Sequence, residues 1–235
     1  MKLYMSYGTQ HPARIVRAGE YEWDEIAREL LTPVTSDDKT SAGWYCPAKF
    51  EPEYRHSDNF VARYALTLDY DQITVEDIDK LQVAFLSNLY VVYTTASHAP
   101  EKPRLRVFMP LSRPADELEF GAVSRRVAQW AGIELASRES HAHAQMMYRP
   151  TVKPGATFRG KVHEGQILDV DAVLKTYASF ADRRSWPRRS LGDDAGTGEA
   201  GVPPEEKPGI IGAFNRAYSV EEAIEQFDLP YRRVR

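Results

Sequence analysis

The sequence predicts an α+β fold, because strand and helix patterns alternate along the middle of the chain. Residues 59–71, NFVARYALTLDYD, alternate apolar and polar side chains with period two, as a half-buried strand does. Thr74, with Asp77 three residues on, then gives the start signal of a helix. The patterns continue as strand, strand, helix and strand, which makes a split β-α-β order. That order is typical of RRM-like and ferredoxin-like sandwiches of helices on one sheet.

Each of the other elements is predicted from its own pattern. β-branched and aromatic runs, or period-two alternation, predict strands over 3–7, 90–95, 104–111, 144–148 and 166–170. Apolar residues at helical spacing predict helices over 21–31, 74–86, 114–130 and 170–180. Gly132 is expected to end the third of these helices, because glycine is common just after a helix C-terminus.

Composition and charge exclude several classes of protein. The chain has 235 residues and a formal charge of −4, so binding to nucleic acid would need a local basic patch. Cys46 is the single cysteine, which excludes an internal disulfide and a cysteine-rich zinc module. The N-terminal sequence has no signal-peptide core, and no apolar run approaches membrane-spanning length. We therefore expect a reducing, intracellular compartment.

The composition changes near Arg183. From there the sequence reads RRSWPRRSLGDDAGTGEAGVPPEEKPG, which is rich in glycine, proline and charge and typical of a mobile linker. A helical rhythm returns further on, where Ser219 and Glu222 form a capping-box pattern. We expect a catalytic body over residues 1–182, a flexible linker over 183–208, and a short helical segment over 209–235.

Asp69 and Asp71 stand at the end of the strand over 59–71. Residues i and i+2 of a strand share a face, so the two carboxylates are expected to project together. Close carboxylates repel each other unless a cation lies between them, and Mg²⁺ or Mn²⁺ is the usual one. The alternative is a solvated strand end before a turn, where aspartate is common.

A histidine and two arginines follow on the neighbouring strands. His98 lies in a polar turn, and Arg104 and Arg106 share one face of the strand over 104–111. Beside a carboxylate-bound metal ion, these groups would suit a triphosphate. Taken alone, the two arginines are better explained as a solvent-facing strand whose arginines form surface ion pairs. Together with the two carboxylates, they favour a functional site.

A second motif allows a different enzyme. His141 and His143 flank one alanine, and Tyr148 follows five residues later. HUH-type nickases hold a metal ion with such a histidine pair and attack DNA with a tyrosine, although short motifs match by chance often. Here the strand is expected to begin only after the pair, which favours two histidines in a polar connection.

Three runs taken together resemble a known family. ALTLDYDQI, YTTASHAPEKPRLRVFMPLSRP and AQMMYRPT are similar to the N-terminal primase-polymerase (PrimPol) domain of phage and plasmid replication proteins, in the archaeo-eukaryotic primase superfamily. The resemblance implies an RRM-like catalytic core with flanking α/β elements. It also implies a DNA-dependent primase or DNA polymerase that copies a single-stranded template by two-metal nucleotidyl transfer.

The resemblance assigns roles by position. It implies catalytic roles for Asp69, Asp71 and His98, and Mg²⁺ or Mn²⁺ as the cofactor. The nucleotide-binding residues that it implies are His98, Arg104, Arg106 and Tyr148. The third metal-binding acid of the family falls at Ser137 here, so we expect the nearby Glu139 to complete the metal site with Asp69 and Asp71.

The same resemblance implies binding partners, and it leaves two alternative functions open. The partners are a single-stranded DNA template, dNTP or NTP, and a replicative helicase domain or subunit to which residues 209–235 would lead. No membrane is expected, and the place of action would be the cytoplasm of a bacterial host. A degenerate member that binds single-stranded DNA or nucleotide without catalysis stays open, because Ser137 replaces an acid. A loading module for a helicase stays open as well.

Overall fold

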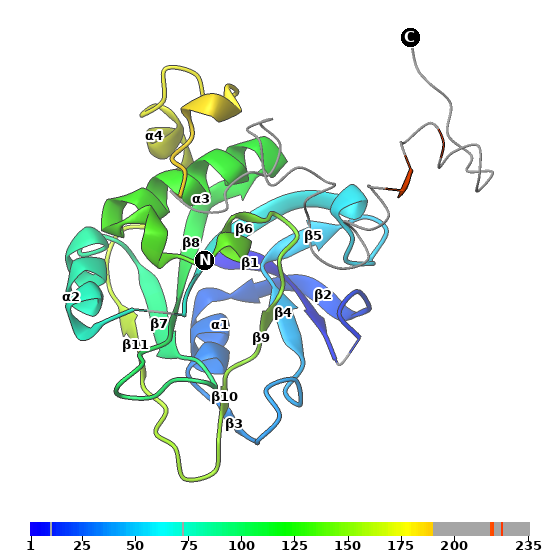
Figure 1. Ribbon diagram of the computed structural model, residues 1–235. Helices are drawn as coiled ribbons and strands as arrows, with labels where there is room; N and C mark the ends of the chain where they lie inside the picture. The colour runs from blue at the N-terminus through cyan, green and yellow to red at the C-terminus, as the bar shows by residue number, and fades with distance from the viewer. Residues whose placement is uncertain (10, 72, 190–216, 219–221, 223–235) are drawn as a thin grey trace. The chain divides into compact units, whose positions relative to one another are not determined.

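Three β-sheets and four α-helices make up the described part of the computed structural model, which covers residues 1–9, 11–71, 73–189, 217, 218 and 222 (Figure 1). The chain divides into two units, Met1–Asp193 and Asp194–Arg235. Nearly all described residues belong to the first unit. The predicted helical segment over 209–235 lies almost wholly outside the described residues, as does the linker after residue 189.

The mixed α+β class that the sequence predicts is confirmed. The five-stranded sheet has the order β11-β7-β8-β6-β5, with β5 Ala48–Phe50, β6 Phe60–Tyr70, β7 Tyr90–Thr94, β8 Leu105–Ala115 and β11 Gly160–His163. The four-stranded sheet has the order β2-β1-β4-β9, with β1 Lys2–Gly8, β2 Ile15–Glu22, β4 Trp44–Cys46 and β9 Met147–Tyr148. A small parallel sheet joins β3 Val34–Thr35 to β10 Thr151–Val152. The helices are α1 Trp23–Leu30, α2 Val75–Ala84, α3 Glu117–Ala131 and α4 Val170–Leu174.

The predicted split β-α-β unit is present in the five-stranded sheet. Strand β8 lies between β6 and β7 and pairs antiparallel with both, while α2 connects β6 to β7. The last predicted strand of the unit belongs elsewhere, because β9 pairs with β4 in the other sheet. The chain before β9 is held at the end of β6 instead, where the Ser137 amide donates to the Asp69 carbonyl at 2.7 Å.

Other differences from the predicted elements have local causes. The strand predicted over 166–170 is reduced to single bridges at Gln166 and Leu168. Helix α4 ends at Leu174, earlier than predicted. Strand β2 was not predicted, because none of its residues is fully buried and it carries no alternating apolar signal. The short strands β3, β4, β5, β10 and β11 are two to four residues long, too short for a periodicity to be read.

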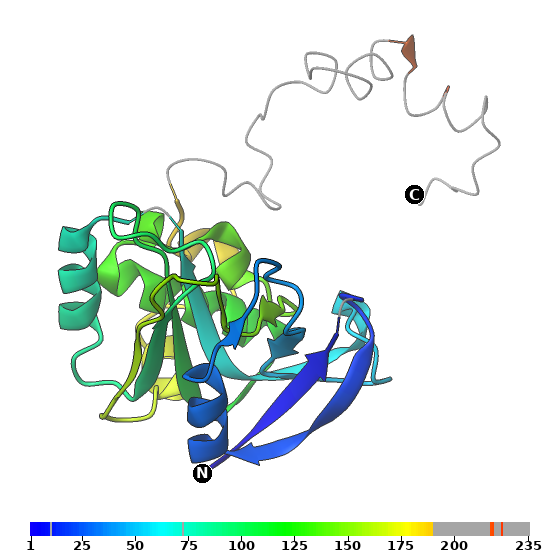
Figure 2. The same cartoon turned by 90° about the horizontal axis from the view of Figure 1, so that it is seen from below.

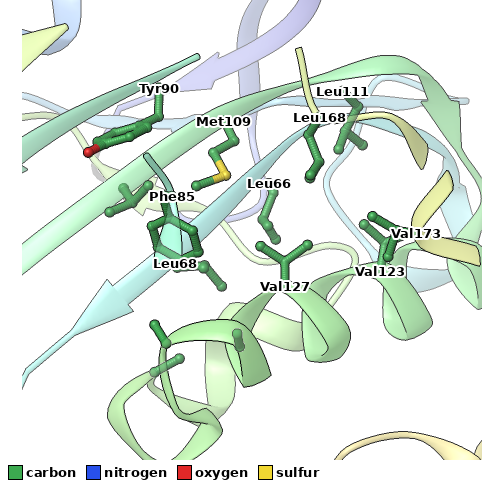
Figure 3. Packing of buried hydrophobic residues seen from close by; sticks show 14 of the residues in the cluster. Leu66, Leu68, Phe85, Tyr90, Met109, Leu111, Val123, Val127, Leu168 and Val173 are labelled. Atoms are coloured by element: carbon green, nitrogen blue, oxygen red, sulfur yellow. The ribbon is translucent and has the colours of Figure 1, made fainter. Parts of the chain in front are cut away.

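Helices cover one face of the five-stranded sheet. Alternate side chains of β6 and β8, among them Leu66, Leu68 and Met109, pack against Val123 and Val127 of α3 (Figure 3). The opposite face packs on α1 and the four-stranded sheet through Ala65, Phe108 and other residues of a second cluster, and Figure 2 shows α1 and β1 on that side. The period-two pattern of the sequence therefore divides β6 between two apolar layers, and Asp69 points to the second.

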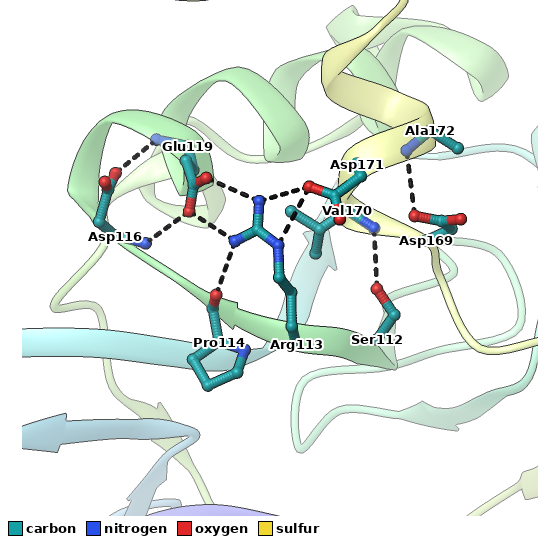
Figure 4. Close-up of polar contacts among 9 residues, drawn as sticks. All are labelled: Ser112, Arg113, Pro114, Asp116, Glu119, Asp169, Val170, Asp171 and Ala172. Atoms are coloured by element: carbon teal, nitrogen blue, oxygen red, sulfur yellow. Dashed lines mark hydrogen bonds and ion pairs between the residues drawn. The ribbon is translucent and has the colours of Figure 1, made fainter.

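An arginine joins the ends of three elements near the start of α3. Arg113 of β8 donates to Glu119 at 2.7 and 2.9 Å and to Asp171 at 2.6 and 3.1 Å (Figure 4). Glu119 also forms a capping box with Asp116 at the N-terminus of α3. Hydrogen bonds to Glu119 and Asp171 raise the pKa of Arg113 above its usual range. This network holds α3 and α4 to the sheet, away from the carboxylates Asp69 and Asp71.

A fully buried arginine fixes the chain that leads to β9. Arg63 of β6 is 0% exposed and donates to the carbonyls of His143 and Gln145 at 2.8 and 2.9 Å, and to the Thr67 hydroxyl at 2.7 Å. Its guanidinium also lies 4.9 Å from the centre of the Phe120 ring. Burial lowers the pKa of Arg63. These contacts tie residues 143–145 to the sheet, directly before Met147 and Tyr148.

Residues 183–189, which the sequence places at the start of the linker, pack on α3. Trp186 contributes to the main apolar cluster, and its indole nitrogen donates to the Phe180 carbonyl at 2.7 Å. A Cβ atom on Gly121 would lie 2.6 Å from the Trp186 ring, so this close approach requires glycine in α3. We call residues 183–189 the arginine strap. An aromatic side chain therefore anchors the first residues of the predicted linker on α3.

The N-terminus of α2 gives a prediction about pH. Asp77 accepts hydrogen bonds from the Thr74 amide and hydroxyl and from Lys80, and these lower its pKa to about 2. A carboxyl with a lowered pKa in the folded state stabilises the fold above its unfolded pKa, and the stabilisation is lost as the pH falls through the folded value. Stability contributed by Asp77 should thus disappear between about pH 4 and pH 2.

Asp77→Asn is expected to lower the free energy of unfolding by about 1 kcal/mol at neutral pH. Below about pH 3 the loss should shrink, because the wild-type carboxyl is then protonated too. Urea unfolding across this pH range measures both effects, with Glu76→Gln as the matched control on the same helical turn. An equal loss at neutral and acid pH would contradict the proposed cause.

Candidate active site

Asp69 and Arg106 form an ion pair across two strands. Asp69 is directly opposite Arg106 in the register of β6 and β8. Two guanidinium nitrogens donate to the two carboxylate oxygens, at 3.0 and 3.2 Å, and the third donates to the Tyr148 carbonyl at 3.0 Å. The side chain of Arg106 is only 10% exposed. Burial lowers its pKa, but the Asp69 charge outweighs this and holds the pKa of Arg106 well above its usual range.

Asp71 makes a parallel but more exposed pair. Its Oδ1 accepts a hydrogen bond from Arg104 at 2.9 Å, and the Asp71 side chain is 43% exposed. The Ser137 hydroxyl donates to Oδ2 at 3.4 Å. The two predicted carboxylates are therefore at the same strand end, and each is paired with one of the two predicted arginines.

A pocket of about 230 Å³ opens over these pairs, between the two larger sheets. The five-stranded sheet contributes Asp69, Asp71, Arg104 and Arg106, and the chain on the opposite wall contributes Lys39, Tyr148 and Arg149. Four basic side chains thus face two carboxylates, an excess of positive charge that suits an anion with several negative charges. Tyr148 lies where the sequence predicts it, in this pocket.

Two basic residues of this pocket were not predicted. Arg149 forms an ion pair with Glu29 of α1 at 2.8 Å. Because Arg149 directly follows Tyr148, the motif around Tyr148 could have identified it from the sequence. Lys39 lies 5.6 Å above the Tyr148 ring, on a polar loop between β3 and β4. No sequence pattern distinguishes Lys39 from other loop lysines, because only the folding together of distant segments brings it to the pocket that contains Asp69.

His98 lies at a neighbouring pocket. Its ring Nδ1 accepts the Arg104 amide at 3.2 Å, and its side chain lines a separate, mostly apolar pocket of about 900 Å³ under α2, together with Arg159. Partial burial, with the Arg159 charge second, lowers the pKa of His98. Ala96 and Ser97, rather than His98, line the pocket that holds the carboxylates. The predicted histidine therefore contacts Arg104 but lies outside the pocket that holds the predicted acids.

The histidine pair of the nickase hypothesis is not arranged on a strand. His141 is the last residue of a 3₁₀ helix, Arg138–His141, and its Nδ1 lies 3.3 Å from the Ser124 hydroxyl of α3. His143 packs on the Phe60 ring at 4.6 Å between ring centres, and burial lowers its pKa. Neither histidine lines the pocket that contains Tyr148. The two parts of the nickase motif are thus separated.

The residues at the pocket fit one divalent ion better than two. Within the described residues, no group of three or more His, Cys, Asp or Glu side chains is placed to hold a metal ion. Glu139, the predicted third ligand, is exposed on the 3₁₀ helix and does not join the two aspartates. Asp69 and Asp71 keep acceptor capacity, since a carboxylate has about four lone-pair sites. Two carboxylates with water and phosphate oxygens are a usual ligand set for Mg²⁺.

The comparison with family models decides the family. The model of the VapE N-terminal domain matches residues 29–189, which include the pocket and the arginine strap. The chain belongs to the VapE N-terminal domain family. A search of curated proteins finds no match to this VapE N-terminal domain. No helix in the described ranges is both long enough and apolar enough to span a membrane.

A solved structure similar to this VapE N-terminal domain is the AEP domain of the cyanophage S-2L primase-polymerase (PrimPol). The TM-score is 0.44 at 10% sequence identity, over 74% of this chain and 88% of that chain. The resemblance to primase-polymerase domains that the sequence motifs suggested is found in this comparison as well.

Proposed function

We propose that this VapE N-terminal domain is a primase-polymerase that transfers nucleotides on a single-stranded DNA template. The observation that carries the proposal is the pocket in which Asp69 and Asp71 lie among four basic side chains, at the end of β6. In this proposal the unit from β6 to α3 is the RRM-like catalytic core, and residues 209–235 lead to a helicase. The substrate at the pocket is a nucleoside triphosphate, dNTP or NTP, with Mg²⁺ or Mn²⁺.

The residues divide into ligands and positioning groups. Asp69 and Asp71 would hold the metal ion, which when bound supplies charge neutralisation for the phosphates and the leaving group. Arg106 is fully engaged by Asp69 and the Tyr148 carbonyl, so it positions Asp69 and does not grip phosphate. The phosphate groups would instead meet Arg104, Lys39 and Arg149, the other basic residues that line the pocket.

The remaining predicted roles change in this arrangement. The His98 ring accepts a hydrogen bond from the Arg104 backbone amide and does not line the pocket itself. In this proposal His98 therefore acts on the nucleotide only by positioning Arg104. Tyr148 forms the wall opposite the carboxylates and packs under Lys39. We keep Glu139 outside the ligand set, because the exposed 3₁₀ helix carries it away from the pocket.

The test is nucleotide incorporation by the full chain on a single-stranded DNA template, with Mg²⁺ or Mn²⁺ and labelled nucleotides. Asp71→Ala is the decisive variant, because the Asp71 side chain is partly exposed and its loss should not unfold the protein. Incorporation should fall by about 100-fold or more, since several kcal/mol of charge stabilisation depend on the bound ion. Asp79→Ala, an exposed aspartate of α2, is the control. Activity of Asp71→Ala equal to that of the control would reject the proposal.

A binding module without catalysis is the second candidate. Ser137, which donates to Asp71 where a third acid would complete a two-metal site, favours it. Wild-type protein that binds a fluorescent nucleotide in an Asp71-dependent way, and yields no product with either metal, would establish this second function.

A further inference from the structure

We propose that the arginine strap and the adjoining face of α3 form a second contact surface, which binds the phosphate backbone of single-stranded nucleic acid. The surface lies outside the carboxylate pocket, and the identity of its strand as a template rests on the proposed function. Four arginines, Arg183, Arg184, Arg188 and Arg189, occur within seven residues of the strap. The chain as a whole has a net charge of −4, so affinity for a polyanion must come from a local surface such as this.

The strap is fixed in place along α3. Trp186 packs against Gly121, the buried Pro187 accepts a hydrogen bond from Arg125 at 3.2 Å through its carbonyl, and Arg189 donates to the Ala136 carbonyl at 2.6 Å. Arg183 lies near the first turn of α3, where it donates to Glu117 at 3.3 Å. The strap therefore runs from the beginning of α3, at Arg183, to the chain beyond its end, at Arg189.

The strap ends beside the carboxylate pocket. Ala136 directly precedes Ser137, which hydrogen-bonds both to the Asp69 carbonyl and to the Asp71 side chain. A strand that follows the arginine strap is thus led around the end of β6, toward the groups proposed to hold the incoming nucleotide. Arginine suits this task because its planar guanidinium makes paired hydrogen bonds to phosphate oxygens.

The present partners of Arg183 and Arg184 do not compete strongly, whereas Arg189 is more enclosed and also lies 3.7 Å from Glu134. The side chains of Arg183 and Arg184 are 59% and 82% exposed, and they pair with Glu117 and Asp182 at the surface. Such exposed pairs contribute roughly 0–1 kcal/mol each, so phosphate groups can replace the carboxylates. Buried arginines such as Arg63 and Arg106 cannot exchange partners in this way.

The salt dependence of binding tests the surface. A fluorescent oligothymidylate is titrated with the full chain at several NaCl concentrations, and fluorescence anisotropy gives the affinity. Arg183→Gln/Arg184→Gln/Arg188→Gln should lower the slope of log K against log salt by about 2, since each phosphate contact contributes roughly 0.7 for single strands. At low salt, affinity should fall by about tenfold or more. The control Lys2→Gln/Arg14→Gln/Arg28→Gln removes the same charge from exposed positions elsewhere.

Further variants separate an ordered surface from mere charge. Trp186→Ala keeps every arginine and removes the anchor on α3, so it should also weaken binding. Replacing the three arginines by lysine should retain the wild-type salt slope, because the slope depends on the number of positive charges that contact phosphate groups. Thermal unfolding of each variant verifies that the body remains folded.

Two results would overturn the proposal. The first is a strap variant whose salt slope equals that of the control. The second is competition by poly-glutamate that is as effective as competition by DNA, which would mark a general surface for anionic protein. Failure of the proposed function gives a different pattern, because nucleotide incorporation would then be absent while the strap-dependent salt slope persists.

Discussion

Asp69→Ala is expected to lower the free energy of unfolding by about 3 kcal/mol or more, whereas Asp71→Ala should lower it by less than about 1 kcal/mol. Asp69 is the carboxylate partner of Arg106, whose side chain is only 10% exposed. Removing Asp69 leaves that guanidinium buried without its counter-charge. Asp71 and Arg104 are 43% and 25% exposed, so water can replace the lost partner.

Thermal and urea unfolding of both variants measure this difference. For a chain of this size, about 3 kcal/mol corresponds to a fall of roughly 6–12 °C in the melting temperature. Asp69→Ala/Arg106→Met removes both charges and should recover most of the loss, because a buried pair is replaced by apolar volume. Equal destabilisation by Asp69→Ala and Asp71→Ala would contradict the assigned burial. The contrast also makes Asp71 the cleaner position for judging metal-dependent chemistry.

The strands and helices with long periodic patterns could be predicted from the sequence. The alternation of residues 59–71 gave β6 and the shared face of Asp69 and Asp71, and the Thr74–Asp77 pattern gave the capping box of α2. These features depend on neighbours within a few residues, which a periodicity reports directly.

The rest of the site depends on contacts between distant segments. The sequence predicts that Arg106 lies near the carboxylates. Only the register of β6 and β8 shows that its guanidinium is paired with Asp69. Lys39 and Arg149 reach the pocket because β4 and β9, strands of only three and two residues, pair in the second sheet. Trp186 looked like part of a linker, since nothing local reveals that Gly121 leaves room for its ring.

Ser137→Asp is expected to strengthen Mn²⁺ binding by about tenfold or more, which corresponds to about 1.4 kcal/mol. The Ser137 hydroxyl lies 3.4 Å from Asp71 Oδ2, and the Ser137 amide is held by the Asp69 carbonyl. A carboxylate at this position would therefore complete a set of three acids at the end of β6. Affinity for hard divalent ions rises with the number of charged oxygen ligands.

The rise in melting temperature with Mn²⁺ concentration measures this affinity without reference to activity, because an ion that binds only the folded state stabilises it by mass action. Ser137→Asn is the matched control, with nearly the same shape and no charge. Without metal, Ser137→Asp should be less stable than Ser137→Asn, because the new carboxylate lies beside Asp71. Added Mn²⁺ should reverse that order. If Ser137→Asp also gains nucleotide incorporation, the missing third acid is what limits catalysis in the wild type. If Ser137→Asp and Ser137→Asn respond alike to Mn²⁺, the two aspartates do not form a metal site, and the pocket binds anions through its basic side chains alone.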